Sequence, residues 1–166
     1  MDDPELNRLA AELLDLERQR HGAPLPESGS ARRQALISAL MDRLNQHPGD
    51  ERRRFLRIPA QIEVRFRVGG ASITCAATEM GLGGLALAGH LWVIDQPIVL
   101  EELSLGGKRF PLECTCRVAW KIDDEDGQPK AGLQFVEPSS DARKQLRAIF
   151  EELFLQYLAT LAQDGP

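Results

Sequence analysis

The residues best suited to bind an anion form a basic cluster, Glu51-Arg-Arg-Arg-Phe-Leu-Arg57-Ile-Pro59. An arginine guanidinium is planar and permanently charged, so it can pair through two hydrogen bonds with a phosphate or with the O6/N7 edge of guanine. It can also stack on a purine. The cluster therefore predicts a local site for a nucleotide-like anion, although a solvated charged linker has the same composition.

A second candidate stretch is Glu79-Met-Gly-Leu-Gly-Gly84, which is followed by the apolar residues Leu85-Ala-Leu87. Glu79 offers a carboxylate that can accept hydrogen bonds, and Gly84 permits close approach of a ligand to the backbone.

The same stretch also fits a loose G-x-G-x-x-A dinucleotide fingerprint over residues 81–86. Glu101 and Glu102 lie near the distance at which its acidic partner occurs. The sequence after the stretch contains Gly89 and Pro97 and provides no convincing βαβ unit, which argues against this alternative.

Composition places the chain among ordinary soluble globular proteins. It has 166 residues, of which 43% are hydrophobic and 27% are charged. A formal charge of -5 excludes a global basic field that would hold nucleic acid or an anionic membrane. The acidic start lacks the basic and apolar regions of an export signal, and no apolar run is long enough to cross a bilayer. We therefore expect a cytoplasmic protein without membrane insertion or direct nucleic-acid binding.

The remaining reactive residue types suggest no catalytic or metal site. Cys114 and Cys116 fall on the apolar side of one strand, so burial in the core explains them better than zinc binding. An odd number of cysteines, with Cys75 the third, argues against a disulfide framework. Three histidines lie in unrelated contexts, His21, His47 and His90. We expect no enzyme activity, no metal and no cofactor.

Helical spacing of leucines predicts two helices near the start of the chain. The first covers residues 3–21, and residues 23–30 read as a turn or linker. Ser30 is placed to cap the second helix. Each helix has an apolar side, so we expect a helical extension over residues 1–48 and a second domain over residues 49–166.

From residue 51 the apolar period changes to two, which is typical of strands. Residues 62–68 alternate cleanly, and Gly69-Gly70 predicts a two-residue hairpin turn. A second alternation over residues 110–120 predicts a long strand with a single apolar face. Successive strands without helices between them favour a small antiparallel barrel. A helix over residues 140–162 follows the cap signal Pro138-Ser-Ser-Asp141.

Together these segments resemble the PilZ family. The spacing from Arg53 to Arg57, followed by Ile-Pro and an alternating strand, is similar to the opening motif of that family. Residues 79–84 are similar to its second motif, Asp/Asn-x-Ser-x-x-Gly. Cys116-Arg-Val-Ala-Trp120 and Ala131-Gly-Leu-Gln-Phe-Val136 also look like the family, and the resemblance covers about residues 51–153.

The resemblance implies a mainly β fold, a six-stranded antiparallel barrel with an N-terminal helical extension and a long C-terminal helix. It also implies a site for the bacterial second messenger cyclic di-GMP. In that site Arg53 and Arg57 contact phosphate and guanine, and Arg52 adds a further stacking or phosphate contact.

The second motif departs from the family pattern in two positions. Glu79 replaces Asp or Asn and keeps a carboxylate acceptor on a longer stem, whereas Gly81 replaces Ser and loses a hydroxyl. Gly84 matches the pattern. One lost hydrogen bond is worth about 0.5 to 1.5 kcal/mol, so affinity should fall by about a factor of ten.

We therefore expect a signalling effector in which the segment from Arg52 to Arg57 becomes ordered around cyclic di-GMP and changes an interaction surface. The alternative is a degenerate family member that binds no nucleotide and acts as a protein-interaction adaptor. Leucine-rich faces on the N- and C-terminal helices lead us to expect a protein partner or self-association.

Overall fold

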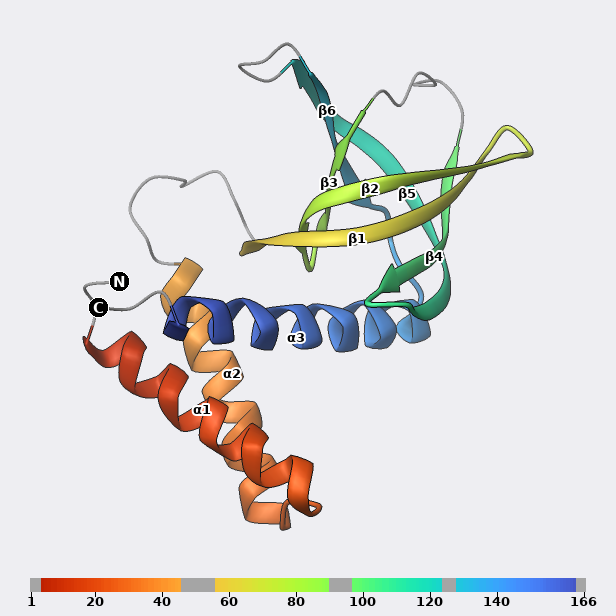
Figure 1. Cartoon of the computed structure of the whole chain (residues 1–166). Coiled ribbons are helices and arrows are strands. Elements are labelled where there is room, and N and C mark those ends of the chain that lie inside the picture. The colour runs from red at the N-terminus through yellow and green to blue at the C-terminus, as the bar shows by residue number, and fades with distance from the viewer. Residues whose placement is uncertain (1–3, 46–55, 90–96, 124–127, 164–166) are drawn as a thin grey trace. The chain divides into compact units, whose positions relative to one another are not determined.

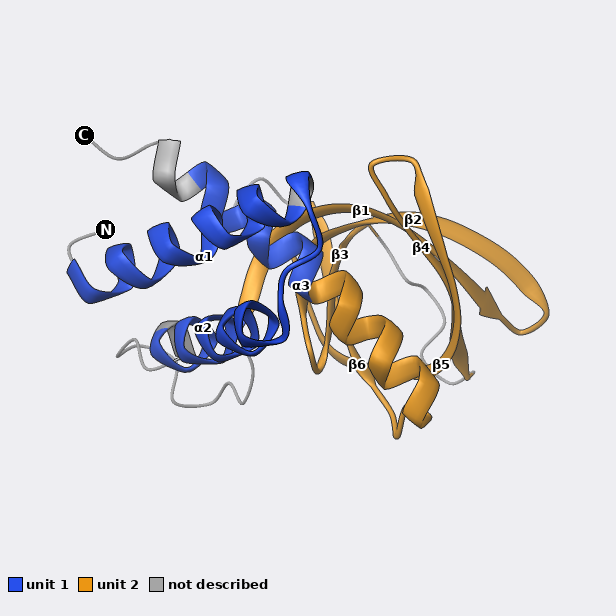
Figure 2. Ribbon diagram, turned by 90° about the horizontal axis from the view of Figure 1, so that it is seen from below, with its two compact units in different colours: residues 1–56, 151–166 blue, residues 57–150 orange. Residues whose placement is uncertain are grey.

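A computed structural model describes residues 4–45, 56–89, 97–123 and 128–163. These residues belong to two compact units, which Figure 2 shows in different colours. Unit 1 comprises residues 1–56 and 151–166, and unit 2 comprises residues 57–150. The long helix α3 (Ser140–Gln163) contributes residues to both. The predicted boundary between two domains, after residue 48, stays a prediction.

Six antiparallel strands of unit 2 close into a barrel (Figure 1). They are β1 (Arg57–Val68), β2 (Ala71–Gly81), β3 (Gly84–Ala88), β4 (Ile98–Leu105), β5 (Lys108–Asp123) and β6 (Pro129–Phe135). Their order around the ring is β1-β2-β3-β6-β5-β4, and the pairing of β1 with β4 closes it. The expected mainly β fold with six antiparallel strands is confirmed.

Alternation of apolar and polar residues determines which face of each strand lines the core. In β1, Ile62, Val64 and Phe66 are at most 1% exposed, and the residues between them point outward. Slipping the register by one residue would move all these side chains to the outer face, so burial specifies the register strongly. Gly69 and Gly70 both have positive φ in the turn that follows, as the predicted two-residue hairpin requires.

Strand β5 departs from the predicted pattern near its end. Val118 lies opposite Leu133, but Trp120 lies opposite Gly132, so the register shifts between them. Residues that lie opposite each other share a face, and Leu133 is buried in the core. Trp120 therefore lies on the outer face with Gly132. The expectation of one apolar face from residue 110 to residue 120 was wrong for Trp120, because the bulge reverses the alternation.

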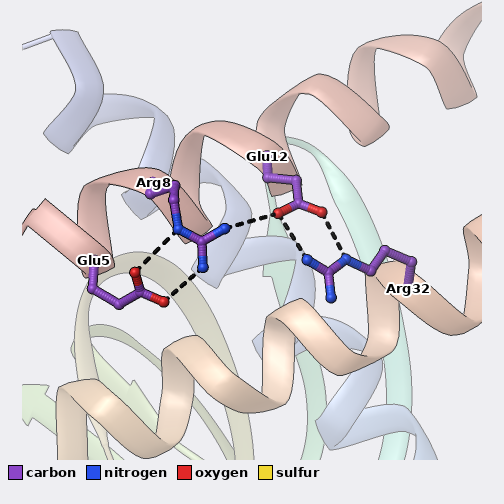
Figure 3. A network of polar contacts seen from close by, with 4 residues as sticks. All are labelled: Glu5, Arg8, Glu12 and Arg32. Atoms are coloured by element: carbon purple, nitrogen blue, oxygen red, sulfur yellow. Dashed lines mark hydrogen bonds and ion pairs between the residues drawn. The ribbon is translucent and has the colours of Figure 1, made fainter.

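Helices α1 (Pro4–Gly22) and α2 (Glu27–Asn45) form the predicted hairpin in unit 1. Arg32 of α2 donates two hydrogen bonds, of 2.6 and 2.9 Å, to the Glu12 carboxylate of α1 (Figure 3). Arg8 pairs with Glu5 at 2.6 Å in the same network. The hydrogen bond from Arg32 lowers the pKa of Glu12 below its usual value.

The start of α2 differs from the sequence expectation. The Ser30 amide donates a 2.9 Å hydrogen bond to the Pro26 carbonyl, which is the i to i−4 bond of a helix. Ser30 therefore lies within the helix and does not cap it. Glu27 in the first turn favours this earlier start, because a carboxylate stabilises the positive end of the helix dipole.

A partly buried ion-pair cluster joins all the helical segments of unit 1. Arg33 of α2 pairs with Glu17 of α1 and, at 3.6 Å, with Glu151 of α3. Arg20 also pairs with Glu17, at 3.0 Å. Each ion pair neutralises a charge in a unit that also buries large apolar residues, Leu6, Leu9, Leu13, Leu36, Ile37, Leu40, Leu153, Phe154 and Leu158. Many of the leucines that motivated the expectation of self-association are thus covered within the chain, and self-association stays a prediction.

Helix α3 begins with the predicted cap. The Ala142 amide donates a 3.1 Å hydrogen bond to the Ser139 hydroxyl, which satisfies one of the free donors of the first turn. Within unit 2 the helix buries Leu146, Ile149 and Phe150. No helix among the described residues is long and apolar enough to span a membrane.

The cysteines lie in or near the barrel core, as expected for Cys114 and Cys116. These two side chains are 2% and 4% exposed. The hydrogen bond with Cys114, together with burial, raises the pKa of the Cys116 thiol well above its ordinary value. Burial raises the pKa of Cys75 to about 11. All three thiols are free.

Candidate functional site

The two sequence motifs meet where β1, β2 and β3 begin and end. Arg57, the first residue of β1, lies opposite Gly81, the last residue of β2. Gly81 in turn lies opposite Gly84, the first residue of β3, across a two-residue turn. Arg57, Gly81 and Gly84 thus form one row across three strands. Arg52 and Arg53 lie outside the described residues, so their place in the site stays a prediction.

A second row lies beside the first on the outer face of the barrel. Glu79 of β2 lies opposite Ala86 of β3, Ala86 lies opposite Gly132 of β6, and Gly132 lies opposite Trp120 of β5. Ile58 and Met80, which alternate with the row residues, are fully buried in the core. The two rows therefore share the outer face, and small residues make up most of the surface between Arg57 and Trp120. We call these two rows the platform.

Two long side chains reach toward each other above the platform. The Arg57 guanidinium carbon is 5.9 Å from the centroid of the Trp120 ring, within the range of a cation–π contact. An Arg57 nitrogen is also 3.9 Å from a carboxylate oxygen of Glu79, a long ion pair. The Glu79 side chain is 45% exposed, against 24% for Arg57. Such a loose and exposed pair is easily exchanged for contacts with a ligand.

Two glycines of the platform are required by their neighbours. A Cβ atom at Gly84 would overlap with the carbonyl oxygen of Leu133 on β6. At Gly132, a Cβ atom would overlap with the Trp120 indole, whose Cζ2 atom would lie 2.7 Å away. Gly84 therefore allows close approach of a neighbouring strand, which the sequence could not distinguish from close approach of a ligand. Its contact with a ligand stays a prediction.

The dinucleotide fingerprint over residues 81–86 is contradicted by the fold. These residues turn from β2 into β3, and no helix begins there. Glu101 and Glu102, the acidic residues considered with it, pair instead with Arg67 and Arg65 on β1. A helix N-terminus that could hold a pyrophosphate is thus missing from this stretch.

Trp120 and Gly132 were not recognised as site residues from the sequence. Both lie in segments that were compared with the family, but regular alternation placed Trp120 in the core. The sequence offered one signal, a tryptophan late in one predicted strand and a glycine within the next. A large residue can pack over a residue that has no side chain. That signal becomes specific only when the register places them opposite each other.

The expectation of no metal site stays a prediction. Within the described ranges, no group of three or more His, Cys, Asp or Glu residues could hold a metal ion. His47 and His90 lie outside those ranges.

Comparisons with known proteins agree with the resemblance. The chain spans about half the length of two solved structures that it resembles, the inhibitor of motility of Bacillus subtilis (MotI/DgrA) and Escherichia coli YcgR in complex with c-di-GMP. The first is 18% identical over 69% of this chain and 53% of its own, with a TM-score of 0.49. YcgR is 17% identical over 68% of this chain and 50% of its own, with a TM-score of 0.54, and it shares the fold.

No curated protein matches the chain. The profile of the PilZ domain matches residues 51–152, which include all six strands and most of α3. This match covers more than half of the chain and contains both motifs. The chain therefore belongs to the PilZ domain family.

Proposed function

We propose that this protein is a cyclic di-GMP receptor that binds its ligand on the platform and converts binding into a changed interaction surface. The observation that carries the proposal is that strand pairing brings Arg57, Glu79, Gly81 and Gly84, from two separate motifs, onto one outer face. Membership of the PilZ domain family and the fold shared with YcgR, which was solved with c-di-GMP, support it.

The chemistry of the platform suits a guanine nucleotide. Arg57 can turn from Glu79 to a phosphate or to the O6/N7 edge of guanine and keep one face on Trp120. Glu79 can accept hydrogen bonds from the guanine N–H groups once Arg57 has moved. Arg52 and Arg53 are proposed to add phosphate and stacking contacts from the segment before β1.

The proposed receptor function needs no catalytic step and no cofactor. The gathered side chains supply hydrogen-bond donors, an indole surface and one carboxylate acceptor, which bind a ligand and do not cleave it. Incubation of the protein with cyclic di-GMP should therefore return the ligand intact. Protein-dependent release of the linear dinucleotide, measured by chromatography, would refute this part.

Calorimetric titration with cyclic di-GMP tests the binding proposal. Arg57→Ala removes a charge-assisted contact worth about 1.5 to 3 kcal/mol, so affinity should fall about ten- to more than a hundredfold. Arg57→Lys should recover only part of it, because lysine lacks the planar fork. Arg67→Ala is the matched control, since Arg67 is another outward β1 arginine and pairs with Glu101 at 2.8 Å.

Equal affinities of the wild type and Arg57→Ala would place the ligand elsewhere. Absence of binding by the wild type would instead favour the adaptor alternative. Gly81 is the reason for that alternative, because it replaces the serine of the second motif and loses its hydroxyl. In that case the helices of unit 1 are the proposed partner-binding part, and light scattering of the ligand-free protein would report self-association.

A further inference from the structure

The row that begins at Arg57 continues beyond the residues of the two motifs. Gly84 of β3 lies opposite Gln134 of β6, and Gln134 lies opposite Arg117 of β5. One cross-strand row therefore has an arginine at each end and the glycines Gly81 and Gly84 between them. It spans four interstrand spacings, roughly 19 Å along the sheet, and both arginine side chains can shorten that gap.

Arg117 is held in position by a neutral partner. Its Nε and Nη2 atoms donate hydrogen bonds of 2.9 and 2.7 Å to the Gln134 side-chain oxygen. An amide oxygen fixes the orientation of the guanidinium without cancelling its charge. Arg67, by contrast, pairs with the Glu101 carboxylate on the same barrel.

The remaining donors of Arg117 are available to an anion. The side chain is exposed, and no carboxylate in the described parts of the chain lies within ion-pair distance of it. An arginine that is already oriented loses less conformational entropy on binding than a mobile one. Its charge and its position in the Arg57 row are separate observations that point to the same kind of ligand.

We propose that Arg117 is a further ligand-binding residue, which contacts a phosphate or a guanine edge at the end of the row opposite Arg57. Gln134 is its positioning residue. This inference rests on the proposed function. A cyclic dinucleotide carries two phosphodiester groups and two guanines, so a molecule held by Arg57 still presents a second anionic group and a second base edge. Neither Gly81 nor Gly84 carries a side chain that would obstruct a ligand lying across the row.

A purely structural role for Arg117 makes a different prediction. If Arg117 only tied β5 to β6 through Gln134, its removal would lower stability and leave the ligand affinity of the folded protein unchanged. The two roles are therefore separated by measuring affinity and thermal unfolding on the same variants.

The test is a calorimetric titration with cyclic di-GMP at one salt concentration. Arg117→Ala should weaken binding by about ten- to a hundredfold, as expected for loss of one charge-assisted contact. Arg117→Lys should lie between the two, and Gln134→Ala should weaken binding less than Arg117→Ala, since the charge remains. Arg67→Ala, which removes the same charge from the same barrel, should stay within about twofold of the wild type.

Wild-type binding that Arg57→Ala weakens and Arg117→Ala does not would overturn the inference and leave the proposed function intact. If the wild type itself fails to bind, the proposed function fails, and the role of Arg117 fails with it. Circular dichroism verifies that each variant is folded. If Arg117→Ala does not fold, Arg117→Lys decides, because a lysine variant with wild-type affinity would refute the contact that the Arg117 guanidinium is proposed to make with the ligand.

Discussion

Substituting alanine for Gly84 and for Gly132, the two platform glycines with close neighbours, should separate a backbone contact from a side-chain contact. At Gly84 the new Cβ would overlap with the Leu133 carbonyl oxygen and lie 3.0 Å from its carbon. A strand backbone in the barrel has little room to move, so Gly84→Ala should destabilise the fold by roughly 1 to 3 kcal/mol or more, as overpacking does. The pairing of β3 with β6 should weaken first.

At Gly132 the overlap is with the Trp120 indole, and a side chain can rotate away. Gly132→Ala should therefore cost less stability than Gly84→Ala but should remove the indole from its contact with Arg57. A cation–π contact at an exposed site is worth about 0.5 to 1 kcal/mol, which corresponds to a two- to fivefold loss of ligand affinity if the ligand uses the same stack.

Urea unfolding and tryptophan emission measure both effects. The sequence has two tryptophans, so a Trp92→Phe background isolates the emission of Trp120. We expect a red shift for Gly132→Ala, because the displaced indole becomes more exposed, and a lower unfolding midpoint for Gly84→Ala. Unchanged Trp120 emission in Gly132→Ala, or a smaller stability loss for Gly84→Ala than for Gly132→Ala, would refute the assigned register.

Three other predictions follow from single residues. Gly81→Ser should tighten cyclic di-GMP binding by up to about tenfold in a calorimetric titration, because it restores a hydroxyl and Gly81 is not among the glycines with positive φ; weaker binding would contradict it. Ser139→Ala should lower the free energy of unfolding by about 1 kcal/mol in urea, through loss of the α3 cap, and an unchanged midpoint would exclude the cap. Because Arg32 lowers the pKa of Glu12, the contribution of Glu12 to stability should be complete at neutral pH and should be lost as the pH falls below about 4. Glu12→Gln should flatten that part of the stability profile.

The sequence predicted the parts of this fold that local chemistry specifies. Alternation over residues 62–68 and the glycine pair at 69–70 determine a strand and a tight turn without help from the rest of the chain. The position of Trp120 depends on a bulge opposite β6, which no local pattern reveals. Ser30 was misread for a related reason, since a serine at a boundary suits either a cap or the first turn of a helix.

The site was predictable only in part. Arg57, Glu79, Gly81 and Gly84 came from motif spacing, and strand pairing brings them to one face. Trp120, Gly132 and Arg117 join that face through β5 and β6, far along the sequence. Their proximity is a product of the barrel order and not of any spacing within a segment.

Amide chemical shifts of the glycines give the most direct test of ligand binding on the platform. In a titration of isotope-labelled protein with cyclic di-GMP, we expect the amides of Gly81, Gly84 and Gly132 and the Trp120 indole N–H to shift together and to saturate at one ligand concentration. The glycines of the β1–β2 and β4–β5 turns, Gly69, Gly70, Gly106 and Gly107, should keep their positions. Unchanged shifts at the platform, or saturable shifts confined to the turn glycines, would contradict cyclic di-GMP binding at this surface.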